Sequence, residues 1–586
     1  MKKIIIIALV LSSASSCKKD TTVVTPPPPT TLSISSFTPT TAGTGATITI
    51  TGTNFTGATS VTFGGVAAAS FVVVNSTTIT AIVATGATGN VVLTTPVGTA
   101  SLAGFTFTTA PPVQKGLVIH HANTGQCYGK AIATDASDNF IIAELFQGSI
   151  IGKPFTSAGN IDALFAKHDK NGNIIWERTA GGAGSLTTPH GVKTDAAGNV
   201  FVTGYFGFAG STTSRTISFD TKTITSKSDY DAFLAKYNSG GTIQWALALG
   251  NTAGVTEDRA WDIAVDNAGN SYISGVFTGS VDFNPLGTTP RIITSSGTTN
   301  SVFIAKYDAN GINQWATKVD ANLGAVLTEA YCALDIDNAG NVFVGGNYRN
   351  SITIGSTNFT AQGNTDIFVA SITQANGTVN WAKTFGGTGN DVISPGALRV
   401  NATGEPHFTG RFAGVSNMGG TTLTSGAGAV TNFYVTALNI NGNTKWAMNV
   451  STNAGQSGGH RVAFDATGNV VVTGWYSGTA SVNGTPITSK NGSNSADVFL
   501  TKLSAAGAVQ WLNTFGAVGY NTAGDLSISA GLAIDTEGNA LITGKFYGAD
   551  VDWDPSVTME LKISSSGMDD GFTAKYKPDG GLWQKP

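Results

Sequence analysis

Residues 199–206 read NVFVTGYF, and the same phrase returns with small changes at 270–277 (NSYISGVF), 341–348 (NVFVGGNY), 469–476 (NVVVTGWY) and 539–546 (NALITGKF). Two weaker copies lie at 139–146 and 405–412. An aspartate, replaced by Asn401 in one copy, precedes each phrase, and the unit repeats at intervals of 60 to 71 residues. Seven copies at a nearly constant period indicate a repeat architecture.

A second repeated phrase ends on tryptophan, as in DAFLAKYNSGGTIQW (231–245) and SVFIAKYDANGINQW (301–315). Seven of the ten tryptophans hold this position, and we interpret them as a packing layer: Trp176, Trp245, Trp315, Trp381, Trp446, Trp511 and Trp583. Short β-forming runs between Asp-x-x-Gly-Asn and Asn-Gly turns predict four strands per unit. Four-stranded units repeated radially are the blades of a β-propeller, so the sequence predicts seven blades over residues 116–586.

The two phrases resemble the bacterial β-propeller repeat family called SBBP, and the resemblance covers residues 116–586. It implies an all-β ring in which the strand before each Asp-x-x-Gly turn is innermost. Residues 116–122 stand where a tryptophan strand would precede the first unit. We therefore expect them to pair into the last blade and to close the ring.

The N-terminus carries the features of a bacterial lipoprotein signal. Lys2 and Lys3 precede an apolar run over 4–11, which is too short to cross a bilayer, and small residues lead to Cys17. Residues 1–17 therefore predict a signal peptide, and the segment before Cys17 resembles a relaxed lipobox with Cys17 as the lipidated residue. The alternative is ordinary cleavage before Cys17, which would leave a free thiol.

The next segments separate the predicted anchor from the propeller. Residues 18–30 contain four consecutive prolines and predict an extended tether. Their first residues are similar to the export segment of Bacteroidetes-like lipoproteins, which implies an outer-membrane protein facing the exterior, although a periplasmic orientation stays open. Residues 31–109 resemble the IPT/TIG domain, an immunoglobulin-like sandwich, through phrases such as VTFGG (61–65) and GFTF (104–107). Residues 110–115 form a linker.

Composition limits the classes of partner. Charged residues make up 12% of the chain and the net charge is −4, so no basic face for nucleic acid is expected. Cys127 and Cys332 fall in the first and fourth units, on opposite sides of a seven-bladed ring. They are therefore expected to be unpaired, because a disulfide needs Cα atoms within about 7 Å. We expect a monomer.

No metal, cofactor or catalytic residue is assigned from the sequence. The six histidines show none of the usual spacings with cysteine or aspartate that hold a metal. The repeated Asp-x-x-Gly-Asn phrase lacks the succession of oxygen ligands of a calcium loop, and we interpret it as turn chemistry.

Candidate binding residues lie where the repeats differ. The positions just before or at the start of the predicted inner strands carry aromatic and polar side chains, and five of them are candidate ligand contacts: Tyr128, His190, Trp261, Tyr331 and His460. If the inner strands surround a channel, these side chains meet at one rim. The long connections at 207–230 and 278–300 are expected to rise on the same side and complete a shallow cup, with Trp261 as its main anchor.

Two classes of function follow from this arrangement. The first is an envelope-anchored binding or adhesion protein that takes a glycan or a protein partner at the rim, since aromatic rings with a few polar neighbours suit a sugar. The alternative is a lyase or hydrolase acting on polysaccharide. That activity would need an acid and a base in one cleft, and the candidates are scattered: Glu257, Asp258, Glu329, Asp391 and His460.

Overall fold

The computed structural model describes residues 31–584, with gaps at 85–87, 108–115, 228, 252–256, 297–299, 322–330, 427–429, 453–454, 483–484, 491–495, 517–528, 556–560 and 567–568. The predicted signal peptide with Cys17, the tether and the linker at 110–115 lie outside the described residues. The described chain consists of strands and contains no helix, which confirms the predicted all-β class. It divides into two compact units, Met1–Gln114 and Lys115–Pro586.

The first unit is a sandwich of two sheets, in the orders β1-β3-β7-β6 and β2-β9-β8-β4-β5. Alternate side chains of β3, such as Ile48 and Ile50, are buried between the sheets while the intervening threonines are more exposed, because successive side chains of a strand point to opposite faces. The strands are β1 Ser33–Thr38, β2 Thr41–Ala42, β3 Thr47–Thr53, β4 Ser60–Phe63, β5 Val66–Ala67, β6 Ser70–Asn75, β7 Thr78–Ile82, β8 Gly89–Thr95 and β9 Gly98–Phe107.

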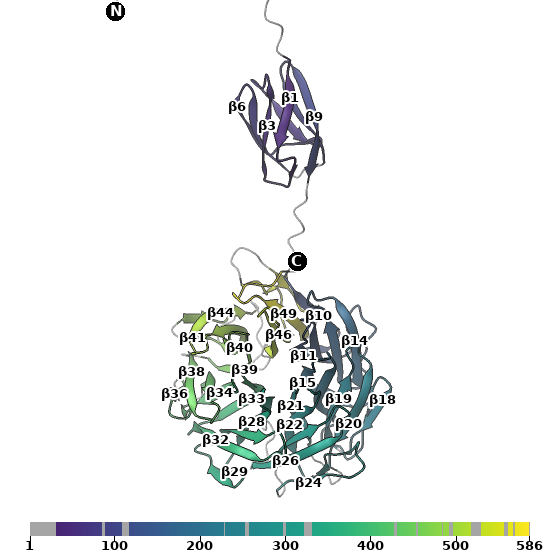
Figure 1. The fold of residues 1–586 in the computed structure, drawn as a ribbon, viewed down its shortest axis with the longest axis vertical. Coiled ribbons are helices and arrows are strands. Elements are labelled where there is room, and N and C mark those ends of the chain that lie inside the picture. Colours follow the sequence, from purple (N-terminus) through teal and green to yellow (C-terminus); the bar gives the residue numbers. More distant parts are fainter. Residues whose placement is uncertain are drawn as a thin grey trace, which may run out of the picture. The chain divides into compact units, whose positions relative to one another are not determined.

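The second unit is a ring of seven four-stranded antiparallel blades (Figure 1), as the two repeated phrases predict. The strand that ends in each Asp-x-x-Gly turn is innermost, and successive inner strands are neighbours around the ring, including the first and the last. These seven inner strands are β11 Gln126–Thr134, β15 Leu186–Thr194, β21 Arg259–Val265, β27 Cys332–Ile336, β33 Asp391–Val400, β39 Ser457–Phe464 and β45 Ser529–Ile534.

The second and third strands of each blade are buried almost throughout, because a neighbouring blade covers each face of the sheet. The second strands are β12 Phe140–Gln147, β16 Val200–Gly207, β22 Ser271–Phe277, β28 Asn341–Tyr348, β34 Pro406–Ala413, β40 Val470–Ser477 and β46 Ala540–Phe546. The third strands are β13 Asp162–His168, β19 Tyr230–Tyr237, β25 Ser301–Tyr307, β31 Asp366–Thr373, β37 Thr431–Leu438, β43 Ala496–Leu503 and β49 Asp570–Tyr576.

The outer strands carry the repeated tryptophans and link each blade to the next. In blades one to six these strands are β14 Ile174–Gly181, β20 Ile243–Leu249, β26 Asn313–Ala321, β32 Val379–Gly387, β38 Thr444–Thr452 and β44 Val509–Phe515. The six tryptophans of these strands each donate the indole N–H to a backbone carbonyl in the turn between the third and outer strands of the following blade, as Trp176 does to Ser239 at 3.0 Å. The glycine of that turn, Gly241, has φ +81°, and a Cβ there would lie 2.7 Å from the indole. The predicted packing layer is thus also a set of hydrogen-bonded clamps.

The repeated aspartates form turns, as expected. Asp135 accepts the backbone N–H groups of Ser137 and Asn139 at 2.9 and 3.0 Å, and its second oxygen accepts the Asn139 side-chain amide. Asp195, Asp266, Asp465 and Asp535 form the same set of bonds. The motif Asp-x-x-Gly-Asn is therefore accounted for by hairpin geometry.

Residues from the start of the second unit close the ring. Strand β10, Val118–His121, pairs antiparallel with β49 and supplies the outer strand of blade seven. Beside it, the Leu117 N–H donates to the Trp583 carbonyl at 3.0 Å. Leu117 also packs on the turn glycine Gly172 of blade one, where the other blades receive a tryptophan from their neighbour. The expected role of residues 116–122 is confirmed.

Hairpins between second and third strands extend outward rather than over the channel. Strands β17 Thr216–Phe219 and β18 Lys222–Thr225 belong to blade two but pair with β14 of blade one. The other hairpins placed in this way are β29 Ser351–Ile354 with β30 Thr357–Thr360, β35 Val415–Asn417 with β36 Thr422–Thr424, and β41 Thr479–Val482 with β42 Thr485–Thr488. Two short pairs, β23 Ser280–Asp282 with β24 Ile292–Thr294 and β47 Val551–Asp552 with β48 Lys562–Ile563, complete the sheets.

Cys127 and Cys332 are both buried and unpaired, as predicted. In the described part of the chain, no helix is long and apolar enough to cross a membrane.

Candidate functional site

The inner strands give the ring two distinct ends. All seven run in one direction, from the connections that precede them to the Asp-x-x-Gly turns. We call the end at which the inner strands begin the loop end, and the end at which they finish the turn end. Tyr331 immediately precedes its inner strand, and Tyr128 and Trp261 lie near the start of theirs, toward the loop end. His190 and His460 were expected just before or at the start of theirs, but they lie near the middle of β15 and β39, at a bulge that shifts the strand register.

Three of these five residues meet in an aromatic cluster on blades two to four. The His190 ring lies 4.5 Å from Trp261, and Trp261 lies 5.3 Å from Tyr331, both edge to face. Tyr205 stacks on His190 at 5.4 Å and contacts Tyr230 at 5.1 Å. We define the aromatic cluster by these residues: His190, Tyr205, Tyr230, Trp261 and Tyr331.

Arg259 lies against this cluster and gives it a charged centre. Its guanidinium is 4.8 Å from the Tyr205 ring centroid and 5.1 Å from that of Tyr230, within the range of cation–π attraction. It also forms an ion pair with Glu257 at 2.5 Å. Burial raises the pKa of Glu257, and Arg259 offsets part of that rise. The cluster thus presents aromatic rings together with one cation and one carboxylate.

Trp261 does not occupy the position expected of a main anchor. Its side chain is only 5% exposed and packs between blades. His190 and Tyr331 are half-buried and border it. Burial lowers the pKa of His190 well below its usual value, and the cations Lys130, Arg461 and Arg259 lower it further, so the imidazole is neutral at pH 7. Trp261 therefore supports the rings around it rather than offering its own face.

Tyr128 and His460 lie outside this cluster. Tyr128 of blade one is half-buried beneath the Lys545 ammonium, which is 4.1 Å from its ring. His460 of blade six is half-buried, and its backbone carbonyl accepts a hydrogen bond from Arg461 at 3.2 Å. The prediction that the connections 207–230 and 278–300 complete a cup at the rim is wrong. The hairpin within 207–230 pairs with the outer strand of blade one, and Val281 of the hairpin within 278–300 bridges to Asn251, which follows the outer strand of blade two.

Tyr205 and Tyr230 are site residues that we did not predict, since Tyr205 belongs to a repeated phrase and Tyr230 immediately precedes one. A signal for Tyr205 exists within the phrase T-G-x-F. The residue between the glycine and the final aromatic differs in every copy: Leu145, Tyr205, Val276, Asn347, Arg411, Trp475 and Lys545. That variable position faces the loop end, where Lys545 covers Tyr128 and Tyr205 contacts His190.

Farther along the channel, cations outnumber carboxylates. Arg399 pairs with Asp262 at 2.9 Å. Arg461 reaches from blade six to the Lys130 carbonyl of blade one at 3.5 Å. Burial and the nearby Arg461 lower the pKa of Lys130 to about 8. Within the described residues, this group contains four cations, Lys130, Lys193, Arg399 and Arg461, and two carboxylates, Asp262 and Asp335.

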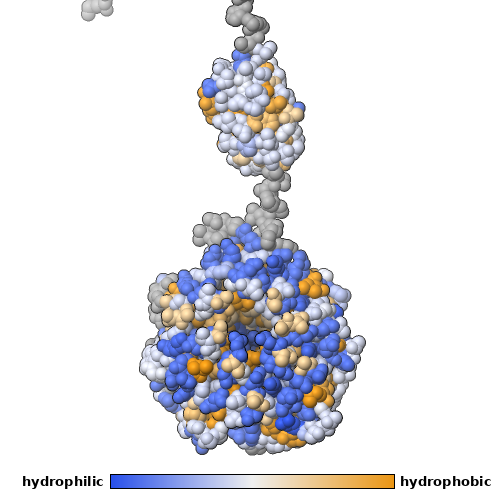
Figure 2. Space-filling view, in the orientation of Figure 1, coloured by the Kyte–Doolittle hydropathy of each residue, from blue (hydrophilic) through white to orange (hydrophobic). Residues whose placement is uncertain are grey.

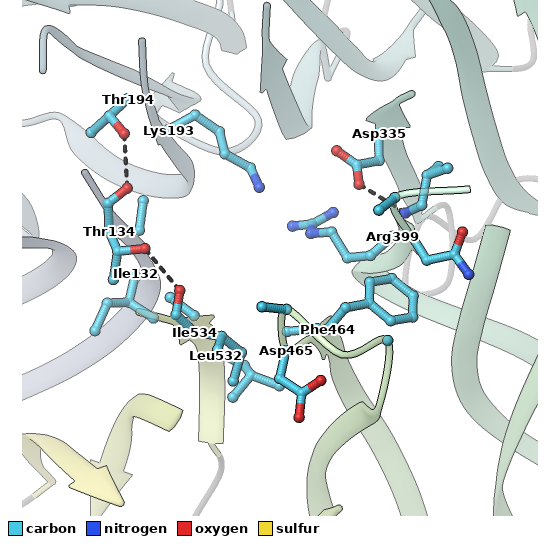
Figure 3. A pocket seen from close by; sticks show the side chains of 18 residues that line it. Ile132, Thr134, Lys193, Thr194, Asp335, Arg399, Phe464, Asp465, Leu532 and Ile534 are labelled. Atoms are coloured by element: carbon cyan, nitrogen blue, oxygen red, sulfur yellow. Dashed lines mark hydrogen bonds between the residues drawn. The ribbon is translucent and has the colours of Figure 1, made fainter. Parts of the chain in front are cut away.

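A cavity of about 450 Å³ opens at the turn end of the channel (Figure 3). Six of the seven inner strands or their turns contribute to its wall. Lys193 and Arg399 point into it from opposite sides, and Asp335 lies beside Arg399. In the space-filling view, the visible face of the ring is hollowed near its centre, where hydrophilic residues gather (Figure 2).

The carboxylates considered for catalysis have structural partners. Asp258 is buried and accepts the backbone N–H groups of Asn251 and Thr278 at 2.9 and 3.0 Å. Asp391 is buried and accepts the Gly387 N–H at 2.8 Å; burial raises its pKa to about 7. Glu257 pairs with Arg259, and Glu329 lies outside the described residues. None of the three described carboxylates is matched with a base in a cleft.

No group of three or more His, Cys, Asp or Glu side chains that could hold a metal ion occurs among the residues that the structure describes.

Comparison with known proteins finds a domain family that matches the first unit and a relative whose similarity extends into the second. Residues 32–109 match the IPT/TIG domain family, in agreement with the predicted sandwich. An uncharacterized WD repeat-containing protein of Acanthamoeba polyphaga mimivirus is 24% identical over 500 residues, covering 76% of this chain and 31% of that protein. The chain thus spans about a third of the length of this curated relative.

Solved structures with some likeness to the chain include two propeller-like proteins. Quinohemoprotein alcohol dehydrogenase from Comamonas testosteroni is 11% identical, with a TM-score of 0.37 over 80% of this chain and 77% of that one. BamB from Moraxella catarrhalis is 12% identical, with a TM-score of 0.32 over 78% of this chain and 98% of that one. The assignment of seven blades rests on the strand pairing described above.

Proposed function

We propose that the protein is a cell-envelope lipoprotein, exposed at the outer surface, that binds a glycan or a protein partner at the loop end of its propeller. The IPT/TIG domain and the repeated blades suggest a binding or adhesion-type protein. The observation that carries the proposal is the aromatic cluster with Arg259 and Glu257 at that end.

The chemistry of the cluster favours recognition over catalysis. Aromatic rings stack on the apolar faces of sugars, while a few charged groups fix the orientation of the hydroxyls. Rings held by edge-to-face contacts, such as the half-buried Tyr331 against the buried Trp261, are ordered before a ligand arrives, which reduces the entropy lost on binding.

A glycan array tests this proposal directly. The chain with its signal peptide removed should bind a subset of polysaccharides without releasing shorter products. Tyr331→Ala should weaken that binding by at least about tenfold, because the loss of one aromatic contact can exceed about 1.4 kcal/mol. Ile440→Ala removes an exposed apolar side chain from a turn far from the cluster and should leave binding unchanged. Equal binding by Tyr331→Ala, or release of oligosaccharide products, would argue against the proposal.

The proposed anchor is tested separately. Cys17→Ser should release the protein from the membrane fraction, because the acyl chains on that residue would supply the attachment. If the variant still sediments with membranes in high salt, the anchor lies elsewhere.

A further inference from the structure

The channel contains, from its middle to its turn end, an incompletely balanced cluster of charge. Arg399 is paired with Asp262, and the backbone N–H of Val400 donates to Asp335 at 2.9 Å. Lys193 forms no ion pair and no side-chain hydrogen bond with any described residue. Lys130 and Arg461 lie off the cavity wall, farther into the channel, and the charge of Arg461 also acts on Lys193.

Such an excess is costly in a partly enclosed space, where charges are screened less than in bulk water. Burial and the nearby Arg399 lower the pKa of Lys193, while Asp335 and Asp262 raise it in part. Burial and the nearby Arg399 also lower the pKa of Arg461, to about 10. An anion placed between these groups would relieve their repulsion.

The cavity has the size and the wall for more than a bare ion. Its volume of about 450 Å³ lies within the range of small-molecule sites. Lys193 and Arg399 reach into it, whereas apolar side chains line much of the remaining wall, among them Ile132, Phe464, Leu532 and Ile534 (Figure 3). Asp465, which also borders the cavity, is occupied by an ion pair with Lys502 at 2.9 Å.

We propose that this cavity binds a ring-sized ligand that carries one carboxylate, such as a uronic acid or a uronate residue of an acidic polysaccharide, with Lys193 and Arg399 as its charged contacts. The anionic group lies between the ammonium and the guanidinium, and the ring packs against the apolar wall. Arg399 is already held by Asp262, so its position is fixed, whereas Lys193 gains its first ionic partner. This site is separate from the aromatic cluster and goes beyond the function proposed for the loop end.

Calorimetric titration of the full mature chain with glucuronate tests the site. Glucose, which has the ring without the charge, and inorganic phosphate, which has charge without the ring, are the comparison ligands. Glucuronate should bind more tightly than either, and its affinity should fall as salt increases. Lys193→Gln should weaken binding by about 10- to 100-fold, because a hydrogen bond to a charged group is lost.

Lys193→Arg keeps the charge and should retain binding. Lys222→Gln makes the same neutral substitution on an exposed lysine of β18 and should have no effect. A second measurement needs no variant: lysine acetylation read by mass spectrometry should show Lys193 protected by glucuronate and Lys222 not protected. The proposal is overturned if glucuronate fails to bind, if glucose or phosphate binds equally well, if Lys193→Gln binds like the wild type, or if Lys193 is not protected.

Discussion

Arg259 shows how one side chain can organise a group of rings. Its guanidinium lies 4.8 to 5.9 Å from the ring centroids of Tyr205, Tyr230 and Trp261, and Glu257 neutralises it. The rings come from blades two and three, so the contact also joins neighbouring blades. Binding and packing are therefore coupled at this position.

Trp261→Ala tests that coupling. The side chain is 5% exposed, and removing a buried tryptophan should lower the free energy of unfolding by about 3–5 kcal/mol. Chemical denaturation measures this change, and Ile440→Ala, at an exposed position, should stay within about 0.5 kcal/mol of the wild type. A stability for Trp261→Ala equal to that of the wild type would show that the ring is not part of the core.

The binding residues illustrate what a single sequence can and cannot predict. His190, Trp261 and Tyr331 were predictable because they interrupt a repeat at equivalent ends of three consecutive blades, and consecutive blades are neighbours in a ring. Tyr205 was hidden in the repeated phrase at 199–206, which was used only to identify the repeat. The convergence of Lys193, Arg399 and Asp335 has no spacing signal, since it arises from the closure of the ring across blades two, four and five.

Among the strands, β10 has the most individual role. It comes from the start of the second unit, yet it completes the last blade, so its pairing joins the two ends of the ring. The sequence predicted this strand because 116–122 occupies the place of an outer strand. It did not predict the hairpins such as β17–β18, which pair across blades, because their long connections keep no common length or phrase.

Deletion of residues 116–122 should lower the melting temperature clearly. The change removes a four-residue ladder and the buried Leu117, which together contribute roughly 5 kcal/mol. Scanning calorimetry compares this chain with one that lacks residues 18–24 of the tether, which should melt like the wild type. An unchanged melting temperature after the first deletion would contradict the role of β10 in closure.

Strand β10 also makes closure sensitive to pH. His121 Nδ1 lies 2.5 Å from the buried Glu144 carboxylate of β12. The charge of Glu177 also raises the pKa of His121, and the charge of Lys153 lowers it. Burial alone would lower the pKa of His121, but Glu144 outweighs it and the pKa is raised. The protonated pair therefore stabilises the fold fully below about pH 6.5, the unfolded value, and this contribution is lost as pH rises through the folded pKa.

The paired substitution His121→Gln with Glu144→Gln removes both charges and should remove that part of the pH dependence. Denaturation at a series of pH values from 5 to 9 measures it. The wild type should lose more stability than the double variant as pH rises, whereas parallel curves would show that the pair does not titrate as described.

For the whole molecule, the repeats build a rigid ring and the departures from repetition supply its chemistry. Tryptophan clamps, aspartate turns and buried middle strands recur from blade to blade. The aromatic cluster occupies one end of the channel and the cationic cavity the other. A propeller built in this way can bind different ligands at its two ends while the scaffold between them stays fixed.

The most direct test is hydrogen exchange of the intact chain with and without a polysaccharide selected on the glycan array. The account predicts that protection appears at the starts of the inner strands of blades two to four, in peptides covering 186–192, 257–263 and 331–334. Exchange in the outer strands and in the first unit should be unchanged. Protection confined to the outer strands or to residues 32–107 would contradict the central claim that the loop end of the propeller is the binding surface.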